Sequence, residues 1–83
     1  MSDEFIIRII SSARKHGLSR RRIEQVLAAY TRVETIHTPS TDPKLRFIGV
    51  DSRGEEIEVV CVVLPNVFLV IHAMPTRFRR SAR

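Results

Sequence analysis

Residues 55–73, EEIEVVCVVLPNVFLVIHA, give the clearest indication of the fold in this sequence. Its first part, residues 55–64, alternates acidic and apolar residues and then becomes continuously apolar, which is typical of a central β-strand. Pro65-Asn66 is a turn signal, and residues 67–73 are again rich in β-branched and aromatic residues. The stretch therefore predicts a β-hairpin, in which Cys61 is a small buried hydrophobe rather than a nucleophile.

Two further strands are predicted before this hairpin. Residues 33–38 and 45–51 are rich in strand-forming residues, and the Pro39–Pro43 segment between them is a loop. The Ser52-Arg53-Gly54 segment predicts a turn in which the glycine adopts a positive φ. The strands follow one another in the chain, so they predict an antiparallel meander.

Two helices are predicted ahead of the sheet. Residues 5–13 carry apolar side chains at helical spacing, and Gly17 is a stop signal; the β-branched residues in this segment leave a strand open as an alternative. Ser19 caps a second helix over residues 20–30. The three arginines in the first turn of that helix oppose its dipole, which suggests another use for them, although solubility explains them as well.

The size and composition fit one small domain. The chain has 83 residues, 43% of them hydrophobic, and a single cysteine, which excludes an internal disulfide and a cysteine-based zinc cluster. We expect an α+β fold with two N-terminal helices packed on a three- to four-stranded antiparallel sheet over residues 1–73, and a basic tail over residues 74–83. No targeting or membrane-spanning segment is visible, so a cytoplasmic protein without a membrane partner is expected.

The net charge of +5 is unevenly distributed along the chain. Residues 8–32 carry seven bases and one acid, residues 74–83 carry four bases, and residues 33–58 are acidic overall. Basic blocks of this kind bind nucleic acid through phosphate contacts. A solvated helix face followed by a frayed tail would carry the same charges, and charge alone does not decide between the two interpretations.

Four short motifs carry a resemblance to a known family: Lys15-His16-Gly17-Leu18-Ser19, Arg46-Phe47-Ile48-Gly49, Ser52-Arg53-Gly54 and Ile71-His72-Ala73-Met74-Pro75-Thr76-Arg77. In order and spacing they resemble the BrnT family of bacterial toxins, distant relatives of RelE-type ribonucleases. The resemblance covers most of the chain. It implies a RelE-like fold and the toxin of a type II toxin–antitoxin system, an endoribonuclease that stops translation.

The same resemblance implies the partners. The neutralising partner would be a BrnA-like antitoxin of the ribbon-helix-helix class, and operator DNA would be bound only through that antitoxin. A homodimer, or a heterotetramer with the antitoxin, is compatible with a chain of this size. The chain departs from the family pattern at His72, where the family has a serine, and at Met74, where a basic residue often follows.

RNA can be cleaved by attack of its own 2′-hydroxyl on the neighbouring phosphate. The protein must then align the attack, transfer protons and stabilise negative charge on the phosphoryl oxygens, and this reaction requires neither a metal nor a cofactor. Arginine can bind two phosphate oxygens with a permanent charge, and histidine transfers protons near neutral pH. The catalytic candidates are Arg46 for phosphate stabilisation, as its match to the family's arginine implies, His72 for proton transfer, and Arg77. The candidate RNA-binding residues are the other prominent bases: Lys15, Arg20, Arg21, Arg53, Arg79 and Arg80. This hypothesis requires Arg46 and the C-terminal arginines to converge on one anionic pocket.

Structural alternatives accompany these assignments. A lone histidine at the end of an apolar strand is more often hydrogen-bonded structure than catalyst, and His16 at a helix C-terminus is interpreted as structural. Because of the departure at Met74, a catalytically inactive toxin-like module that binds RNA or a partner protein through its basic face is the second hypothesis. A third is a structural subunit whose sheet edge pairs with another chain.

Overall fold

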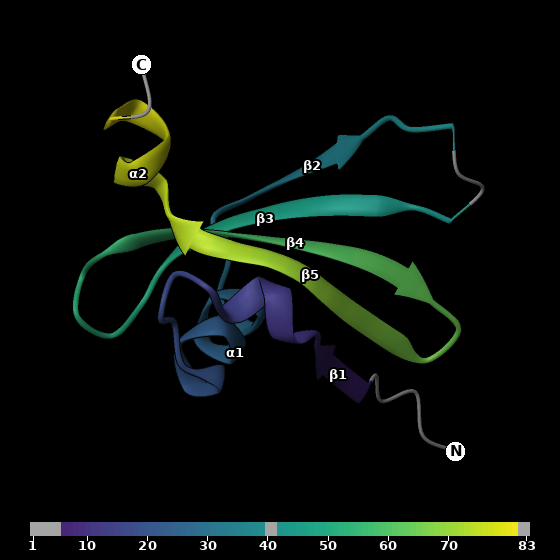
Figure 1. Cartoon of the computed structure of the whole chain (residues 1–83), viewed down its shortest axis with the longest axis horizontal. Helices are drawn as coiled ribbons and strands as arrows, with labels where there is room; N and C mark the ends of the chain where they lie inside the picture. The colour runs from purple at the N-terminus through teal and green to yellow at the C-terminus, as the bar shows by residue number, and fades with distance from the viewer. Residues whose placement is uncertain (1–5, 40–41, 82–83) are drawn as a thin grey trace.

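A computed structural model describes residues 6–39 and 42–81 of the chain, except for the side chains of residues 79–81. In this part of the chain a five-stranded sheet lies between one helix and a short C-terminal helix (Figure 1). The elements are β1 (Ile6–Ile9), the 3-10 helix η1 (Ser11–Arg14), α1 (Arg20–Ala28), β2 (Arg32–Ile36), β3 (Lys44–Val50), β4 (Glu56–Leu64), β5 (Val67–Pro75) and α2 (Thr76–Ser81).

The sheet is mixed, with the strand order β1-β5-β4-β3-β2. Strands β2 to β5 form the predicted antiparallel meander, whereas β1 pairs in parallel with β5 at the edge. The predicted turns are confirmed: Leu64 pairs directly with Val67 across Pro65-Asn66, and Gly54 has a φ of 84°. Strand β4 is central, as its apolar pattern predicted.

The prediction of two N-terminal helices on an antiparallel sheet is wrong in its first element. Ile6–Ile9 is a strand, and only Ser11–Arg14 beyond it forms a single 3-10 turn. The spacing of the apolar residues fits a helix, but the β-branched isoleucines favour an extended backbone. In the extended state this segment also pairs with β5, which would otherwise be the edge strand of the sheet. The second helix is confirmed as α1, and the Ser19 hydroxyl accepts a hydrogen bond from the amide of Arg22 at its start.

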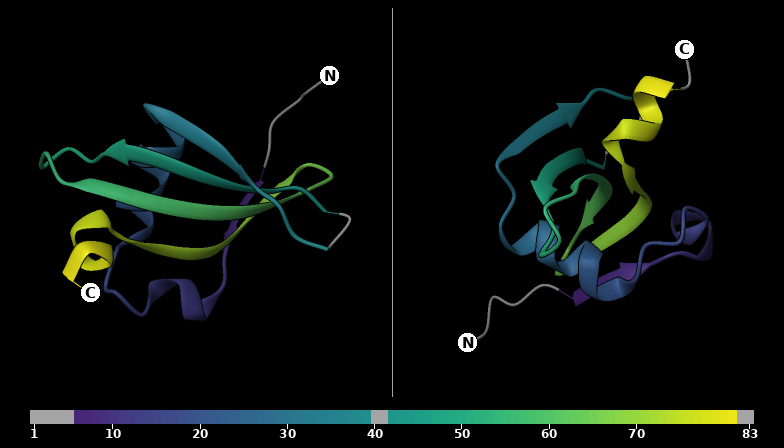
Figure 2. Two further views of the ribbon diagram at one scale, coloured as in Figure 1. Left: turned by 90° about the horizontal axis from the view of Figure 1, so that it is seen from above. Right: turned by 90° about the vertical axis from the view of Figure 1, so that its left-hand side faces the viewer.

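The two faces of the sheet have different surroundings. One face packs on α1 and η1, where Ile23 and Val26 join buried side chains of the three central strands, including Val59 and the free cysteine Cys61. Burial raises the pKa of the Cys61 thiol to about 12. We call the opposite face the open face, and the short helix α2 lies beyond it at one end of β4 and β5. Figure 2 shows the curved sheet with α1 and α2 on its two sides.

A β-bulge in β5 changes the direction of one side chain. Val60 pairs with His72, but the next residue, Cys61, pairs with Val70, so Ile71 is the extra residue. Without the bulge, Val70 and His72 would point to the same face, because side chains alternate along a strand. With it, Val70 packs in the α1-face core while His72 shares the open face with Val60.

The basic C-terminal segment does not begin as a tail. Strand β5 continues to Pro75, two residues beyond its predicted end, and Thr76–Ser81 forms the short helix α2. The Thr76 hydroxyl donates a hydrogen bond of 2.7 Å to Glu56 at the start of β4. This contact attaches α2 to the sheet at the end where β4 begins.

Gly49 on β3 lies close to the last turn of α1 and to the residues that follow it. A Cβ atom at this position would lie 3.1 Å from the Cα of Tyr30, with Val26 Cγ1 3.4 Å away. The predicted effect of Gly49→Ala is therefore a loss of roughly 1–3 kcal/mol of unfolding free energy through overpacking, measured by urea denaturation. Val50→Ala, at the exposed neighbouring position, should change stability by only about 0.5 kcal/mol. Equal effects of the two substitutions would contradict this account of the helix–sheet contact.

Candidate functional site on the open face of the sheet

A single cross-strand row of the open face brings two of the predicted catalytic residues together. Glu34 on β2 pairs with Arg46 on β3, Arg46 pairs with Val60 on β4, and Val60 pairs with His72 on β5. Directly paired residues point to the same face of a sheet. Arg46 and His72 therefore lie on one face with only Val60 between them.

Arg46 is held by a carboxylate on the neighbouring strand. Its Nη1 donates to Glu34 Oε1 at 2.8 Å, and 29% of the Arg46 side chain is exposed. The Nε of Arg46 is buried and has no hydrogen-bond partner among the described residues. The carboxylate thus orients the guanidinium from one side, while part of the Arg46 side chain stays exposed to an anion that approaches this face.

His72 is paired with a buried acid that the sequence analysis did not assign to the site. The Nε2 atom of His72 lies 3.0 Å from Oε2 of Glu58, which comes from the open face of β4. The Glu58 side chain is 4% exposed, whereas that of His72 is 31% exposed. The acid therefore lies behind an imidazole that reaches the surface.

The His72 ring lies next to that of His16, which in turn lies near a phenylalanine ring. His16, in the segment between η1 and α1, places its ring edge-on to that of His72 with the centroids 6.2 Å apart. The ring of Phe78 in α2 also lies near that of His16, with the centroids 5.6 Å apart. The Lys-His-Gly motif and the C-terminal helix thus meet at the end of β5, although they are far apart in the sequence.

Arg77 belongs to a different charged cluster. Its Nε lies 2.7 Å from Glu55 Oε2 in the β3–β4 turn, and its guanidinium lies over the ring of Phe78. The other carboxylate oxygen of Glu55 accepts from Arg22 of α1 at 2.8 Å. Arg46 and Arg77 thus contact different carboxylates, on β2 and in this turn. The convergence of Arg46 and the C-terminal arginines on one anionic pocket, which the nuclease hypothesis required, is not seen in these contacts.

The predicted RNA-binding residues are dispersed over the fold. Arg20 is exposed but donates to the Ile7 carbonyl and to Glu24, so it joins α1 to β1. Lys15 and Arg21 are exposed, Lys15 before α1 and Arg21 in its first turn, and Arg53 is exposed in the β3–β4 turn. For Arg79 and Arg80 the backbone lies in α2, and their side chains lie outside the described residues.

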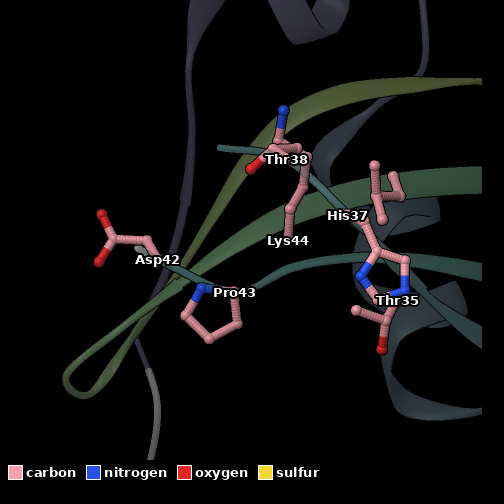
Figure 3. A pocket seen from close by; sticks show the side chains of 7 residues that line it. Thr35, His37, Thr38, Asp42, Pro43 and Lys44 are labelled. Carbon is pink, nitrogen blue, oxygen red and sulfur yellow. The ribbon is translucent and has the colours of Figure 1, made fainter. Parts of the chain in front are cut away.

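Two hollows lie away from this row. A polar one of about 170 Å³ is lined by residues at the β2–β3 connection, and Figure 3 shows the His37 imidazole and the Asp42 carboxylate at opposite ends of it. An apolar one of about 300 Å³ is lined by Ile7, Leu27 and Phe68 together with Glu24 and Ala28. Neither hollow contains a predicted catalytic residue.

Residues 6–39 and 42–81 contain no group of three or more His, Cys, Asp or Glu side chains placed to hold a metal ion. Within the same part of the chain, neither helix has the length and apolar character needed to cross a bilayer.

Comparison with known proteins found no matching family model, no matching curated protein and no matching solved structure.

Glu58 and Lys44 lie near the candidate site but were not singled out from the sequence, and His16 was interpreted there as structural. Glu58 was visible as the polar residue of an alternating strand, but its contact with His72 depends on the register between β4 and β5. Lys44 lies two residues from Arg46 on β3 and hence on the same face. His16 is adjacent to the catalytic candidate only because η1 packs beside the end of β5.

Asp51 organises the turn that joins β3 to β4. Its Oδ1 accepts from the amides of Glu55 and Arg53, and its Oδ2 accepts from Arg22 Nε at 2.8 Å. The Glu55 amide is the main reason that the pKa of Asp51 lies below its usual value of 3.8, with Arg22 adding to the effect and burial opposing it. The charged form is thus favoured in the folded state.

Asp51→Asn should lower the free energy of unfolding at neutral pH, because the amide cannot reproduce the charged interactions. The stabilisation by the carboxylate is fully present above 3.8, and it is lost as the pH falls through the lower pKa of the folded state. Urea titrations of parent and variant should therefore show a constant stability difference down to this value and a narrowing one below it. Ser52→Ala, as the control, should give a pH-independent difference. A difference in unfolding free energy between the parent and Asp51→Asn that stayed constant into strong acid would contradict the stabilising role of the Asp51 charge.

Proposed function

We propose that this chain is the toxin of a type II toxin–antitoxin system, a RelE-like, BrnT-like endoribonuclease that cleaves RNA without a metal and thereby inhibits translation. The proposal rests on one observation, the placement of Arg46 and His72 in the same row of the open face with Val60 between them. A permanent cation and a proton-transfer group on one surface are what cleavage by the RNA's own 2′-hydroxyl requires.

The proposed reaction needs only these side chains and the substrate. His72 removes the proton of a 2′-hydroxyl, and the resulting oxygen attacks the adjacent phosphorus. The bond from phosphorus to the 5′-oxygen breaks, and that oxygen takes up a proton from solvent, which leaves a 2′,3′-cyclic phosphate and a 5′-hydroxyl. Arg46 stabilises the negative charge on the phosphoryl oxygens, for which a guanidinium is suited.

Further bases would guide the RNA strand across this face. Arg8 on β1 and Lys44 on β3 belong to the next cross-strand row, in which Arg8 pairs with Leu69 and Lys44 pairs with Val62. Both side chains therefore share the open face with Arg46. Lys15 and Arg77 lie in the segments that meet near His72. The substrate is single-stranded RNA, because unpaired nucleotides allow the 2′-oxygen to align with the bond that breaks.

A ribbon-helix-helix antitoxin of the BrnA class is the proposed partner, with operator DNA bound through it alone. The competing function is a module that binds RNA or a protein without catalysis. One observation favours that alternative, since Arg46 and Arg77 already contact Glu34 and Glu55. A phosphate must displace or share these carboxylates before either guanidinium can act on it.

Purified protein should cleave single-stranded RNA in the presence of a chelator, and Arg46→Ala should slow cleavage on the order of 10²–10³-fold, as expected when a group that stabilises transition-state charge is lost. Arg32→Ala is the matched control, because Arg32 contacts the same Glu34 at 3.3 Å but is 64% exposed on the edge strand. The control should cleave at close to the parent rate, and Arg46→Lys should fall between the two. RNA that is retained but never cut, by parent and variants alike, would establish the non-catalytic alternative.

Expression of the protein in cells without the antitoxin tests whether Arg77 contributes to the activity. The parent should arrest growth, and both Arg46→Ala and Arg77→Ala should relieve the arrest, whereas Arg53→Ala, a weaker contact of Glu55 at 3.9 Å, should relieve it less. Immunoblotting checks that all variants accumulate equally. Complete growth arrest by both Arg46→Ala and Arg77→Ala would refute the assignment of these arginines to the site.

A further inference from the structure

Glu58 is the one acid of β4 that is buried on the open face, at 3% exposure. Its neighbours on this face, Ile48 and Val60, are apolar and buried. An ionised carboxylate loses favourable hydration when it is buried, and an apolar residue in such a position is often at least as stabilising. Packing against these apolar neighbours therefore does not explain an acid here, and the polar contact between Glu58 and His72 is a feature to explain.

The contact defines the hydrogen-bonding role of each ring nitrogen. An ionised carboxylate can only accept, so with Glu58 ionised the His72 Nε2 that lies 3.0 Å from Glu58 Oε2 carries the proton of that hydrogen bond. In the neutral ring, Nδ1 is then the nitrogen with the free lone pair. Glu58 thus determines which nitrogen of His72 can accept a proton from a substrate.

The ring of His72 is also restricted from other directions. The bulge at Ile71 turns the side chain onto the open face, and the ring of His16 lies edge-on at 6.2 Å with an interplanar angle of 80°. Glu58 anchors the buried side of the ring, while 31% of the His72 side chain stays exposed. A substrate can therefore reach a ring whose orientation is already set.

We propose that Glu58 is the positioning residue of the nuclease site: it holds His72 as the Nε2–H tautomer, so that Nδ1 accepts the proton of the RNA 2′-hydroxyl. This inference rests on the proposed function and assigns a role within it to a residue that neither the motifs nor the charge pattern indicated. When Nδ1 takes up the proton, the imidazole becomes a cation, and the carboxylate behind it stabilises that cation. Glu58 acts through His72 and does not touch the RNA.

The test combines a spectroscopic and a kinetic measurement on the full chain. Nitrogen-15 chemical shifts of the His72 ring, recorded without RNA at a pH where the ring is neutral, distinguish the two tautomers. Glu58→Gln keeps the size of the side chain and removes its charge. Glu56→Gln is the matched control, because Glu56 lies two residues earlier on the same face and is exposed, with a hydrogen bond from Thr76 instead of a histidine.

The parent and Glu56→Gln should both show the Nε2–H tautomer, and Glu58→Gln should show a mixture. In the RNA cleavage assay Glu58→Gln should reduce kcat on the order of 10²-fold with little change in KM, since the group orients a base and does not bind substrate. A Glu58→Gln protein with the parent's tautomer and the parent's kcat would overturn the proposal. So would a parent His72 that carries its proton on Nδ1, and this measurement needs no variant to fold.

The two proposals can fail separately. If the parent never cleaves RNA but its His72 is the Nε2–H tautomer and loses this preference in Glu58→Gln, the nuclease function is wrong and the positioning by Glu58 stands. If the parent cleaves RNA and Glu58→Gln cleaves equally well with an unchanged tautomer, the function stands and the role of Glu58 is wrong.

Discussion

Strand β4 has different neighbours on its two faces, and this difference determines how the core and the candidate site are built. The strand lies in the middle of the sheet, so each of its faces must fit a different set of neighbours. Ile57 and Val59 complete the core under α1, while Glu58 and Val60 point to the open face. Val60 separates Arg46 from His72, and Glu58 holds the His72 ring, so the candidate site is built around the open face of this one strand.

The irregular parts of the fold place the polar groups around that strand. The bulge at Ile71 brings His72 to the same face as Arg46, where regular alternation would have directed it into the core. Arg22 bridges Asp51 and Glu55, which fixes the β3–β4 turn on α1, and Arg77 attaches α2 to the same turn. These ion pairs join α1, the turn and α2 in addition to the core contacts of α1.

Local signals in the sequence were sufficient for much of the fold. The hairpin at Pro65-Asn66, the cap at Ser19 and the turn at Gly54 each depend on a few adjacent residues, and each was predicted correctly. The strand Ile6–Ile9 was not, because its state is decided by parallel pairing with β5 at the other end of the chain. The register and the bulge likewise determine that Glu58 meets His72, and no short-range pattern contains either of them.

RNA binding across the open face can be tested by titrating the protein with a cleavage-resistant 2′-O-methyl oligonucleotide and following the NMR chemical shifts. We expect the largest changes at Arg46, His72 and Lys44, and these changes should saturate together and weaken as salt rises. Changes confined to Arg20 and Arg21 on α1, or no changes at all, would contradict it.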